Sequence, residues 1–309
     1  MTERFRPITH LRHVGLAVPD YQKAAEFYKN TWGLQEVADD GNVAFFATPA
    51  DPENYIVRIR KDTSKRLDLV AFGAASAEDV DAVAERVLAN GFKLDRQPVT
   101  LDTPCGGYGV RFFDIDGRLI EVSSDVEQRP HRLLEERESI PQKLSHVVFN
   151  STNVKATKAF YENTLGFALS DWLEDIMCFM RTGEQHHILA IIQGPHTSLN
   201  HLSFEMRGID EYMRASGRLI RSGRDPLWGP GRHGAGDNTF TYFLDPQGNV
   251  VEYTTELEKI EDEEAWVPRR FETTPESQDQ GGTGGLVTEQ MIPAMFNDPD
   301  LGLWTPSPV

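Results

Sequence analysis

The stretch Leu11-Arg-His-Val14 recurs further along the chain as Leu144-Ser-His-Val147. Three further motifs repeat at the same offset, so that Phe27-Tyr28, Asn30-Thr31 and Gly33 correspond to Phe160-Tyr161, Asn163-Thr164 and Gly166. Several matches at one offset indicate an internal duplication rather than chance. A chain of 309 residues, 39% of them hydrophobic, is long enough for two folded domains. We therefore expect two copies of one structural plan.

Each copy has the pattern of a strand followed by a helix. It opens with an apolar, β-rich run and continues through a segment of helical period that ends at a glycine suited to a helix C-terminus. In the first copy, strand-like runs follow at Val43–Ala47 and Tyr55–Ile59. A second strand and helix are then predicted at Leu67–Phe72 and Ala77–Asn90.

Each copy ends in a predicted hairpin. Tyr108–Phe113 and Leu119–Val122 flank the turn sequence Asp114-Ile-Asp-Gly117, whose glycine favours a turn with positive φ. The second copy has the same arrangement around Asp245-Pro-Gln-Gly248. The sequence therefore predicts an α+β fold of duplicated βαβββ modules, two per domain, with each domain a curved mixed sheet.

The composition along the chain indicates two domains and a tail. We expect an N-terminal domain at 1–135 and a second domain at 136–260, separated by the charged, proline-containing stretch Gln128–Gln142. The segment 261–309 is rich in Pro, Gly, Ser and acidic residues, and we expect an irregular tail that is a lid or a docking segment. Two apolar islands favour docking: Met291–Phe296 and Leu301–Trp304.

The overall charge and the absence of long apolar runs exclude several partners. A formal net charge of −17 argues against nucleic acid and anionic membranes, which carry the same sign of charge. No stretch approaches the roughly 20 apolar residues of a membrane span, and none resembles a signal peptide, so a cytoplasmic protein is expected. With Cys105 and Cys178 as the only cysteines, a disulfide framework or a thiolate zinc site is not expected. A metal would have to be bound by histidine and carboxylate.

Three residues of the second copy form a candidate metal site. His146 and His201 lie on the first strands of the two modules, and Glu252 lies on the last strand. Side chains alternate along a strand, so one residue from each strand can face the same point. Two imidazoles and one carboxylate are the ligand set of the iron(II) facial triad, which leaves open positions for substrate and oxygen. Zinc remains chemically compatible with this set, and manganese(II) could replace iron(II).

The first copy has a different set at the matching places. His13 and Glu121 are retained, but Asp68 stands where the second copy has His201. An anion in place of a neutral imidazole makes a site of different affinity. We therefore expect the domain at 1–135 to be structural and metal-free, and the domain at 136–260 to be catalytic. Any one histidine or glutamate alone is more often an ordinary strand residue, so only the combination of the three indicates a metal site.

Over nearly its whole length the sequence resembles the type I extradiol dioxygenases of the vicinal oxygen chelate superfamily. The motifs that carry the resemblance are Gly229-Pro-Gly-Arg-His-Gly234, then Tyr242, then Asp245-Pro-Gln-Gly-Asn-Val-Val-Glu252-Tyr. The resemblance implies the vicinal oxygen chelate fold, the metal ligand Glu252, a catalytic tyrosine at Tyr242 and a supporting histidine at His233. One departure is Gly236, which stands where some members have an acidic residue.

A second match implies a catalytic histidine. His187-Ile-Leu-Ala190 precedes Leu199-Asn-His201-Leu202, and the family carries its acid/base histidine in the first of these segments and a metal ligand in the second. His187 is therefore the candidate acid/base residue. We expect His186, its neighbour on a strand, to point away. Surface or structural roles are expected for the remaining histidines His10, His131 and His196.

The resemblance further implies extradiol (meta) cleavage of a substituted catechol by O2 at a non-heme Fe(II) centre, with Mn(II) as the alternative metal, in the degradation of aromatic compounds. The family's pocket positions correspond to Val148, Phe179 and Trp228, all apolar or aromatic. A hydrophobic alkyl- or aryl-catechol, of the type cleaved by catechol 2,3-dioxygenases and 2,3-dihydroxybiphenyl dioxygenases, is therefore expected. Arg181 or Arg224 could still bind a carboxylate. Related enzymes assemble as homo-oligomers, which the resemblance implies here too.

Two other functions are compatible with this fold. One is a different metalloenzyme, such as a glyoxalase-type isomerase, and the other is a drug-binding module without catalysis. The histidines and tyrosine beside the metal ligands favour the dioxygenase over both. The sequence does not decide which catechol is cleaved, whether cleavage is proximal or distal to the substituent, which metal is used, or the number of subunits.

Overall fold

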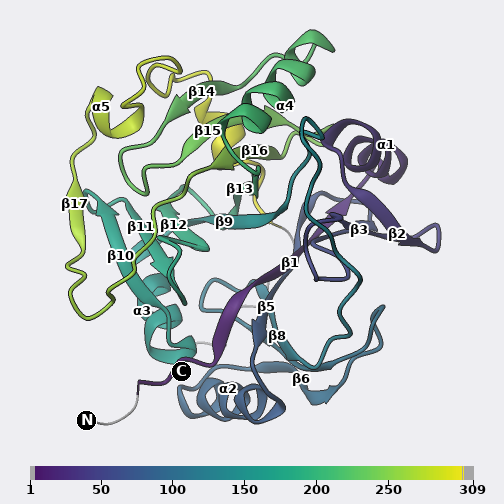
Figure 1. Ribbon diagram of the computed structural model, residues 1–309. Helices are drawn as coiled ribbons and strands as arrows, with labels where there is room; N and C mark the ends of the chain where they lie inside the picture. Colours follow the sequence, from purple (N-terminus) through teal and green to yellow (C-terminus); the bar gives the residue numbers. More distant parts are fainter. Residues whose placement is uncertain (1–3, 301, 303–309) are drawn as a thin grey trace.

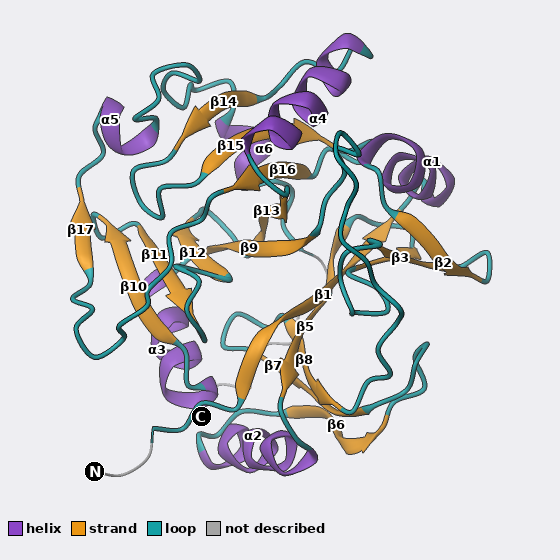
Figure 2. Ribbon diagram, in the orientation of Figure 1, coloured by secondary structure: helices purple, strands orange, loops and turns teal. Residues whose placement is uncertain are grey.

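The computed structural model describes residues 4–300 and 302, which fold into two mixed β-sheets with helices packed on them (Figure 1, Figure 2). The first sheet has eight strands in the order β2-β3-β4-β1-β5-β8-β7-β6. The elements of this half are, in chain order, β1 (Ile8–Val18), α1 (Tyr21–Glu26), the π-helical turn η1 (Phe27–Trp32), β2 (Gln35–Asp39), β3 (Val43–Ala47), β4 (Val57–Lys61), β5 (Arg66–Ala74), α2 (Ala77–Ala89), β6 (Leu94–Thr100), β7 (Tyr108–Phe113) and β8 (Leu119–Ser124).

The second sheet has nine strands in the order β14-β15-β16-β13-β9-β12-β11-β10-β17. The elements of this half are β9 (Lys143–Ser151), α3 (Val154–Leu165), β10 (Ala168–Leu173), β11 (Met177–Arg181), β12 (Leu189–Gln193), β13 (Ser198–Glu205), α4 (Ile209–Arg221), β14 (Trp228–Arg232), β15 (Thr239–Leu244) and β16 (Val250–Thr255). The tail contributes β17 (Arg269–Phe271) and two short helices, α5 (Pro275–Gln278) and α6 (Ile292–Phe296).

Each sheet is built from two βαβββ modules. Within a module the first strand pairs in parallel with the last, as β1 does with β4 and β9 with β12. The two modules of a sheet join through antiparallel pairing of their first strands, β1 with β5 and β9 with β13. The fold class predicted from the repeat is confirmed, because the element order and the pairing are the same in both halves. The hairpins β7–β8 and β15–β16 also form where the turn sequences predict them.

The repeated glycines end the first helix of each copy. Gly33 and Gly166 have φ values of 96° and 79°, in the left-handed region that favours glycine. A Cβ atom on Gly166 would lie only 2.2 Å from the carbonyl oxygen of Phe5, so no larger residue fits there. In the first copy the helix finishes with the wider turn η1 instead of a regular α-helical turn.

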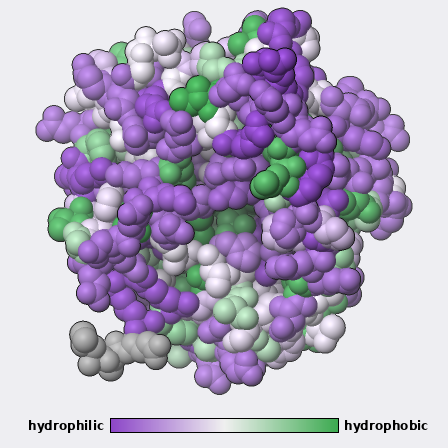
Figure 3. Space-filling model, in the orientation of Figure 1, coloured by the Kyte–Doolittle hydropathy of each residue, from purple (hydrophilic) through white to green (hydrophobic). Residues whose placement is uncertain are grey.

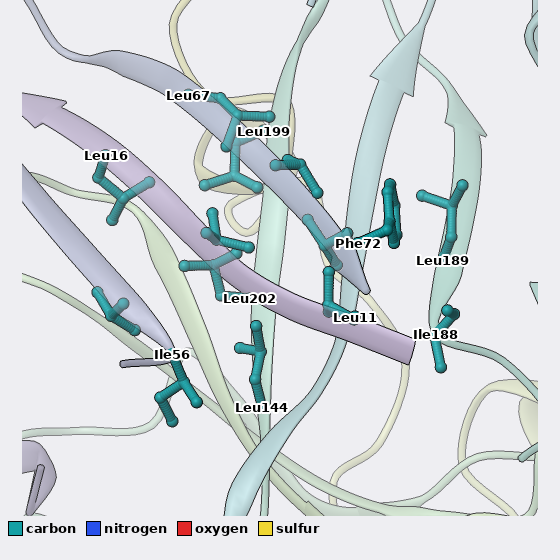
Figure 4. Packing of buried hydrophobic residues seen from close by; sticks show 14 of the residues in the cluster. Leu11, Leu16, Ile56, Leu67, Phe72, Leu144, Ile188, Leu189, Leu199 and Leu202 are labelled. Carbon is teal, nitrogen blue, oxygen red and sulfur yellow. The ribbon is translucent and has the colours of Figure 1, made fainter. Parts of the chain in front are cut away.

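One hydrophobic core cluster joins the two sheets. Figure 4 shows Leu11 and Leu16 of β1 in the same cluster as Leu144 of β9 and Leu202 of β13. These four side chains are almost completely buried. The two domains therefore share a core instead of meeting at a polar boundary.

Trp32 is a fully buried side chain of this core and links the two domains directly. Its ring stacks on Tyr253 of β16 at a centroid distance of 3.9 Å and meets Phe204 and Phe243 edge-on. The Tyr253 hydroxyl donates a hydrogen bond of 2.8 Å to the Trp32 carbonyl oxygen. Because Tyr253 follows Glu252, this packing fixes the strand that carries a candidate metal ligand.

The tail lies against the second domain. Strand β17 pairs in parallel with β10 at the edge of the second sheet, where Figure 1 shows it beside β10. Met291, Ala294 and Met295, from the end of the described tail, pack on the cluster that contains Trp228 and Tyr242. The expected island Met291–Phe296 thus docks, whereas residues 301 and 303–309, which include most of the island Leu301–Trp304, lie outside the described residues.

The face drawn in Figure 3 is mostly hydrophilic, with small scattered apolar areas. Lysine and arginine number 31 against 48 acidic residues, so the charged surface is mainly acidic. Among the described residues, the structure has no helix with the length and apolar character needed to cross a membrane.

We expect Trp32→Ala to lower the free energy of unfolding by about 3–5 kcal/mol, the usual cost of deleting a buried aromatic side chain. Urea unfolding followed by circular dichroism measures this change. Leu133→Ala is the control, because the Leu133 side chain is 92% exposed and its loss should change stability by no more than about 0.5 kcal/mol. Equal effects of the two substitutions would contradict a core shared by both domains.

Candidate metal centre and catalytic site

The three predicted ligands lie on adjacent central strands of the second sheet. Ser203 of β13 pairs in register with His146 of β9 on one side and with Glu252 of β16 on the other. His201 lies two residues before Ser203 and therefore projects from the same face. Residues paired directly across a sheet also share a face, so the sheet itself brings the three side chains together.

The ligand atoms of these residues converge. The Glu252 carboxylate lies 3.1 Å from His146 Nε2 and 3.6 Å from His201 Nε2. One ligand atom from each residue lies within 4.8 Å of the others, and all three residues are buried. The arrangement predicted for His146, His201 and Glu252 is present in the structure.

The chemistry of this donor set fits a divalent cation. Among the described residues, His201 Nε2 and both carboxylate oxygens of Glu252 are buried without a hydrogen-bond partner. His201 Nδ1 donates to the Asn200 side-chain oxygen at 2.7 Å, which leaves the Nε2 lone pair free. His146 Nδ1 lies 3.1 Å from the Ser145 hydroxyl. A buried anion without a donor is costly, so a cation bound here would stabilise Glu252.

Burial sets the protonation of the ligands. It lowers the pKa of His146 and of His201 to about 3, so both rings are neutral near neutral pH and each can offer a lone pair. Burial also raises the pKa of Glu252. A bound cation would favour the ionised carboxylate.

His187 lies beside the ligand cluster. Its ring centroid is 4.3 Å from that of His146, and its side chain is buried. Burial, followed by the neighbouring histidines, lowers the pKa of His187 well below its ordinary value. A neutral imidazole is therefore present next to the metal position.

The expectation that His186 points away is wrong. Its Nδ1 lies 2.9 Å from Nδ1 of His187, and its Nε2 lies 2.8 Å from a carboxylate oxygen of Asp171. The two histidines precede β12 and lie in an irregular segment, so the alternation of a strand does not separate their side chains. His186 is fully buried and belongs to the same cluster as His187.

His233 and Tyr242 lie beside the other two ligands, His201 and Glu252. Tyr242 pairs across the hairpin with Glu252, and its hydroxyl lies 2.9 Å from His233 Nε2. The Tyr242 ring centroid is 5.0 Å from that of His201. His233 Nδ1 donates to the carbonyl oxygen of Gln278 in the tail at 3.0 Å, so Nε2 is left to accept the tyrosine hydroxyl hydrogen. Burial raises the pKa of Tyr242 well above its ordinary value and lowers that of His233.

The three predicted pocket residues divide between two apolar clusters. Val148 and Phe179 pack with Ala190 and Ala235, and the Phe179 ring lies 5.1 Å from that of His187. Trp228 stacks parallel to Tyr242 at a centroid distance of 5.5 Å. Apolar surface is therefore present both beside His187 and beside Tyr242.

The register of the first sheet shows that the expected match of Asp68 with His201 is wrong. Ala71 pairs with both His13 and Glu121. Ser203 pairs in the same way with His146 and Glu252, so Leu69 takes the place of His201.

The buried carboxylates of the first domain are neutralised by arginine side chains. Asp68 pairs with Arg58 and also with Arg60 at 2.6 Å, and Glu121 pairs with Arg111 at 2.8 Å. His13 is buried, and neither of its ring nitrogens has a hydrogen-bond partner among the described residues. Burial alone would raise the pKa of Asp68, but hydrogen bonds and charge from Arg60 and Arg58 lower it to about 2. The arginines provide the positive charge that a cation would bring.

A family model, that of the glyoxalase/bleomycin resistance protein/dioxygenase superfamily, matches residues 10–122 and 143–253. The chain belongs to this superfamily. The two matched segments correspond to the two halves of the duplicated fold, so each copy carries the superfamily pattern by itself. The predicted family and fold are confirmed.

Members of the superfamily similar to this chain include dioxygenases. The chain is 28% identical over 274 residues to metapyrocatechase 2 of Cupriavidus necator, covering 82% of this chain and 83% of the relative. It is 25% identical to the manganese-dependent 2,3-dihydroxybiphenyl 1,2-dioxygenase of Geobacillus genomosp. 3, over 77% of this chain and 82% of the relative. The resemblance to extradiol dioxygenases is thereby confirmed.

A solved structure of another superfamily member is closer in sequence. The Mn(II)-bound glyoxalase from Novosphingobium aromaticivorans is 41% identical and superposes with a TM-score of 0.92, covering 97% of this chain and 98% of that one. Manganese is thus named both for a dioxygenase relative and for the Novosphingobium structure.

The sequence did not predict three residues that are linked to the site by hydrogen bonds. Asp171 bonds to His186, Arg269 bonds to Asp171, and the Gln278 carbonyl bonds to His233. Two of the three belong to the tail, whose composition gave no sign of such contacts. The one available signal was the adjacent pair His186-His187, because two buried imidazoles need polar partners.

We expect the wild-type protein to bind one equivalent of divalent metal per chain and His146→Ala to bind none under the same conditions, because the substitution removes one of three ligands. Metal content after gel filtration, measured by mass spectrometry, tests this. His13→Ala is the matched control at the equivalent position of the first copy and should retain one equivalent. If His13→Ala lost the metal and His146→Ala retained it, the metal would be bound in the first domain, and the assignment to the second domain would be wrong.

The metal-free protein should lose stability as pH falls from about 4 to 2, partly through Asp68. Its folded pKa of about 2 lies below the unfolded value of roughly 3.9, so its stabilising contribution is present above pH 4 and is lost as pH falls through 2. Asp68→Asn should therefore lower stability at pH 5 by about 2 kcal/mol and flatten this decline. Urea unfolding across this pH range measures both effects, with the exposed Asp95→Asn as control. If the free energy of unfolding of Asp68→Asn fell as steeply with falling pH as that of the wild type, the ion pairs of Asp68 would not explain the decline.

Proposed function

We propose that this protein is an extradiol dioxygenase that cleaves the ring of a substituted catechol with O2 at a centre held by His146, His201 and Glu252. The observation that carries the proposal is that His187 lies beside His146, and the hydrogen-bonded pair His233–Tyr242 lies beside His201. Names of dioxygenase relatives support the same activity. Fe(II) is the proposed metal, with Mn(II) as the alternative that two relatives favour.

When bound, a divalent metal held by two imidazoles and a carboxylate supplies adjacent open positions for the two oxygens of the diol and for dioxygen, and it increases the acidity of the diol. The protein must then hold the diol in one orientation and move its protons. These tasks fall to His187, Tyr242 and His233.

His187 is suited to take a hydroxyl proton from the diol and to return it when the ring opens. Its ring is neutral because burial lowers its pKa, and it lies against the His146 ring, where a bound diol would approach. Proton transfer by a positioned side chain typically accelerates a reaction by about 10² to 10⁴.

Tyr242 and His233 would also orient the diol. The high pKa of Tyr242 keeps its hydroxyl protonated, and because this hydrogen is donated to His233 Nε2, the Tyr242 oxygen can accept a hydrogen bond from a catechol hydroxyl. His233 is fixed by the Gln278 carbonyl and in turn fixes the Tyr242 hydroxyl. The pair thus provides one polar contact of defined geometry.

The apolar groups around these residues support a hydrophobic alkyl- or aryl-catechol as substrate. Val148, Phe179 and Trp228 offer ring and aliphatic surface on both sides of the polar groups. Arg181 is committed to the Leu169 carbonyl oxygen, and Arg224 lies over the Phe27 ring in the other domain.

We also propose the domain roles. The domain at 1–135 is structural and metal-free, the domain at 136–260 is catalytic, and the tail at 261–309 docks on the catalytic domain. The arginines on Asp68 and Glu121, and the tail contacts with His233, support this division. A cytoplasmic homo-oligomer, as for the family, completes the proposal. The two cysteines are free, which suits a reducing compartment.

A glyoxalase-type isomerase is the second candidate function, because the Novosphingobium structure carries that name. An isomerase would consume no oxygen. Oxygen uptake therefore separates the two candidates directly.

Protein reconstituted anaerobically with Fe(II), and in parallel with Mn(II), is mixed with 3-methylcatechol or 2,3-dihydroxybiphenyl and then exposed to air. We expect the solution to turn yellow as one O2 is consumed per catechol. An oxygen electrode and an absorbance trace measure both quantities. Formation of S-lactoylglutathione from methylglyoxal and glutathione, without oxygen uptake on any catechol, would favour the isomerase and defeat the proposal.

His187→Phe should retain stoichiometric metal and bind catechol, but its turnover should fall about 100-fold or more, on the scale of general acid–base catalysis. His196→Phe is the control, because its ring contacts the tail carbonyl of Asn297 and lies outside the ligand cluster. Undiminished turnover of His187→Phe would remove this residue from the mechanism.

A further inference from the structure

A chain of hydrogen bonds leads away from His187 into the protein. His187 Nδ1 lies 2.9 Å from His186 Nδ1, and His186 Nε2 lies 2.8 Å from Asp171 Oδ2. Asp171 and His186 are fully buried, and His187 is 2% exposed. A polar chain of this kind in the interior has to be satisfied at every link.

The far end of the chain is held as an anion. Asp171 accepts hydrogen bonds from the Arg269 backbone N–H at 2.7 Å and from its guanidinium at 2.7 and 3.0 Å. Burial alone would raise the pKa of Asp171, but the hydrogen bonds from His186 and Arg269 outweigh it and lower the pKa. An ionised carboxylate can only accept, so His186 Nε2 must donate.

The positions of the ring hydrogens on His186 and His187 follow from this hydrogen bond to Asp171. With a hydrogen on Nε2, the uncharged form of His186 has a lone pair on Nδ1 and accepts there. His187 Nδ1 must then carry the hydrogen of the bond between the two rings. His187 Nε2 is left as the unprotonated nitrogen, which is the state that can accept a proton from a diol.

The same residues do not form a second metal centre. Asp171, His186 and Glu258 place ligand atoms within 4.8 Å of one another, as a cation would require. However, the Arg269 guanidinium pairs with both carboxylates, and both ring nitrogens of His186 are used by Asp171 and His187. No lone pair is directed at a common point, so a network of fixed hydrogen bonds describes the cluster better.

The tail supplies the residue that fixes Asp171. Arg269 lies on β17, which pairs with β10 so that Arg269 and Asp171 are opposite each other. The guanidinium also lies over the Trp266 ring at 4.6 Å, and Trp266 Nε1 donates to the Ser170 carbonyl oxygen at 2.9 Å. The segment 266–271 is thus attached alongside β10, at the edge of the sheet seen in Figure 2.

We propose that Asp171 and His186 are positioning residues that hold His187 in the tautomer whose Nε2 accepts a proton, and that Arg269 of the tail maintains this arrangement by fixing Asp171. The proposal rests on the acid–base role of His187 in the proposed function. It gives the tail strand β17 a part in catalysis although none of its residues reaches the ligand cluster.

The tautomer can be observed without turnover. In metal-free protein labelled with 15N-histidine, the His187 ring signals, identified by their loss in His187→Phe, should show the Nδ1–H tautomer. His186→Phe removes the acceptor and should shift His187 to the Nε2–H form or to a mixture. An unchanged Nδ1–H signature in His186→Phe would overturn the proposal, as would an Nε2–H signature in the wild type.

Kinetics test the consequence. With the metal-loaded protein, His186→Phe should lower kcat on 3-methylcatechol about tenfold or more, a part of the full general acid–base effect, while KM for the diol and metal content stay within about twofold. His186→Gln should recover most of the loss, because its amide oxygen can accept from His187 and its amide nitrogen can donate to Asp171. If the kcat of His186→Gln were no higher than that of His186→Phe, His186 would have only a packing role.

Arg269 has a matched neighbour for its own test. Arg269→Met should lower kcat about threefold to tenfold, within the range of general acid–base effects, and should alter the His187 signature. Arg270→Met should do neither, because Arg270 pairs with Asp175 at the surface. Equal behaviour of the two variants would contradict the role of Arg269. If the wild type cleaved no catechol, the proposed function would fail, and the 15N signature would still decide the positioning claim.

Discussion

The Glu252 carboxylate is buried between two neutral imidazoles and has no hydrogen-bond donor among the described residues. The need to compensate this buried charge is the constraint on which the site in the second domain depends. An uncompensated buried anion is costly, and a divalent cation removes that cost. The fold makes the cluster unavoidable, because His146, Ser203 and Glu252 are paired in register on three adjacent strands. The surrounding core, including the stack of Trp32 on Tyr253, holds those strands in place.

The two domains differ in how the charge of their buried carboxylates is compensated. Both bury carboxylates in a sheet of two βαβββ modules, but the first domain compensates Asp68 and Glu121 with Arg58, Arg60 and Arg111. A guanidinium is permanently charged and forms fixed hydrogen bonds, so it stabilises structure without open coordination positions. A metal ion leaves such positions open. This difference between the copies supports the proposed division into a structural and a catalytic domain.

Much of this arrangement could be predicted from the sequence because the deciding signals are local or repeated. The recurring Leu-x-His-Val motif, the helix-ending glycines and the hairpin turns predict the modules, and the module predicts which strands are neighbours. Contacts that join distant segments without a periodic pattern could not be predicted. Asp171, Arg269 and the Gln278 carbonyl are of this kind. Strand alternation does not predict the direction of the His186 side chain, because the segment that carries it is irregular.

The most direct test of the account is an anomalous difference map from crystals grown with Mn(II). The account predicts one peak per chain within bonding distance of His146 Nε2, His201 Nε2 and a carboxylate oxygen of Glu252. A peak at Asp171, His186 and Glu258, or a metal bound in the first domain with these three residues left empty, would contradict it.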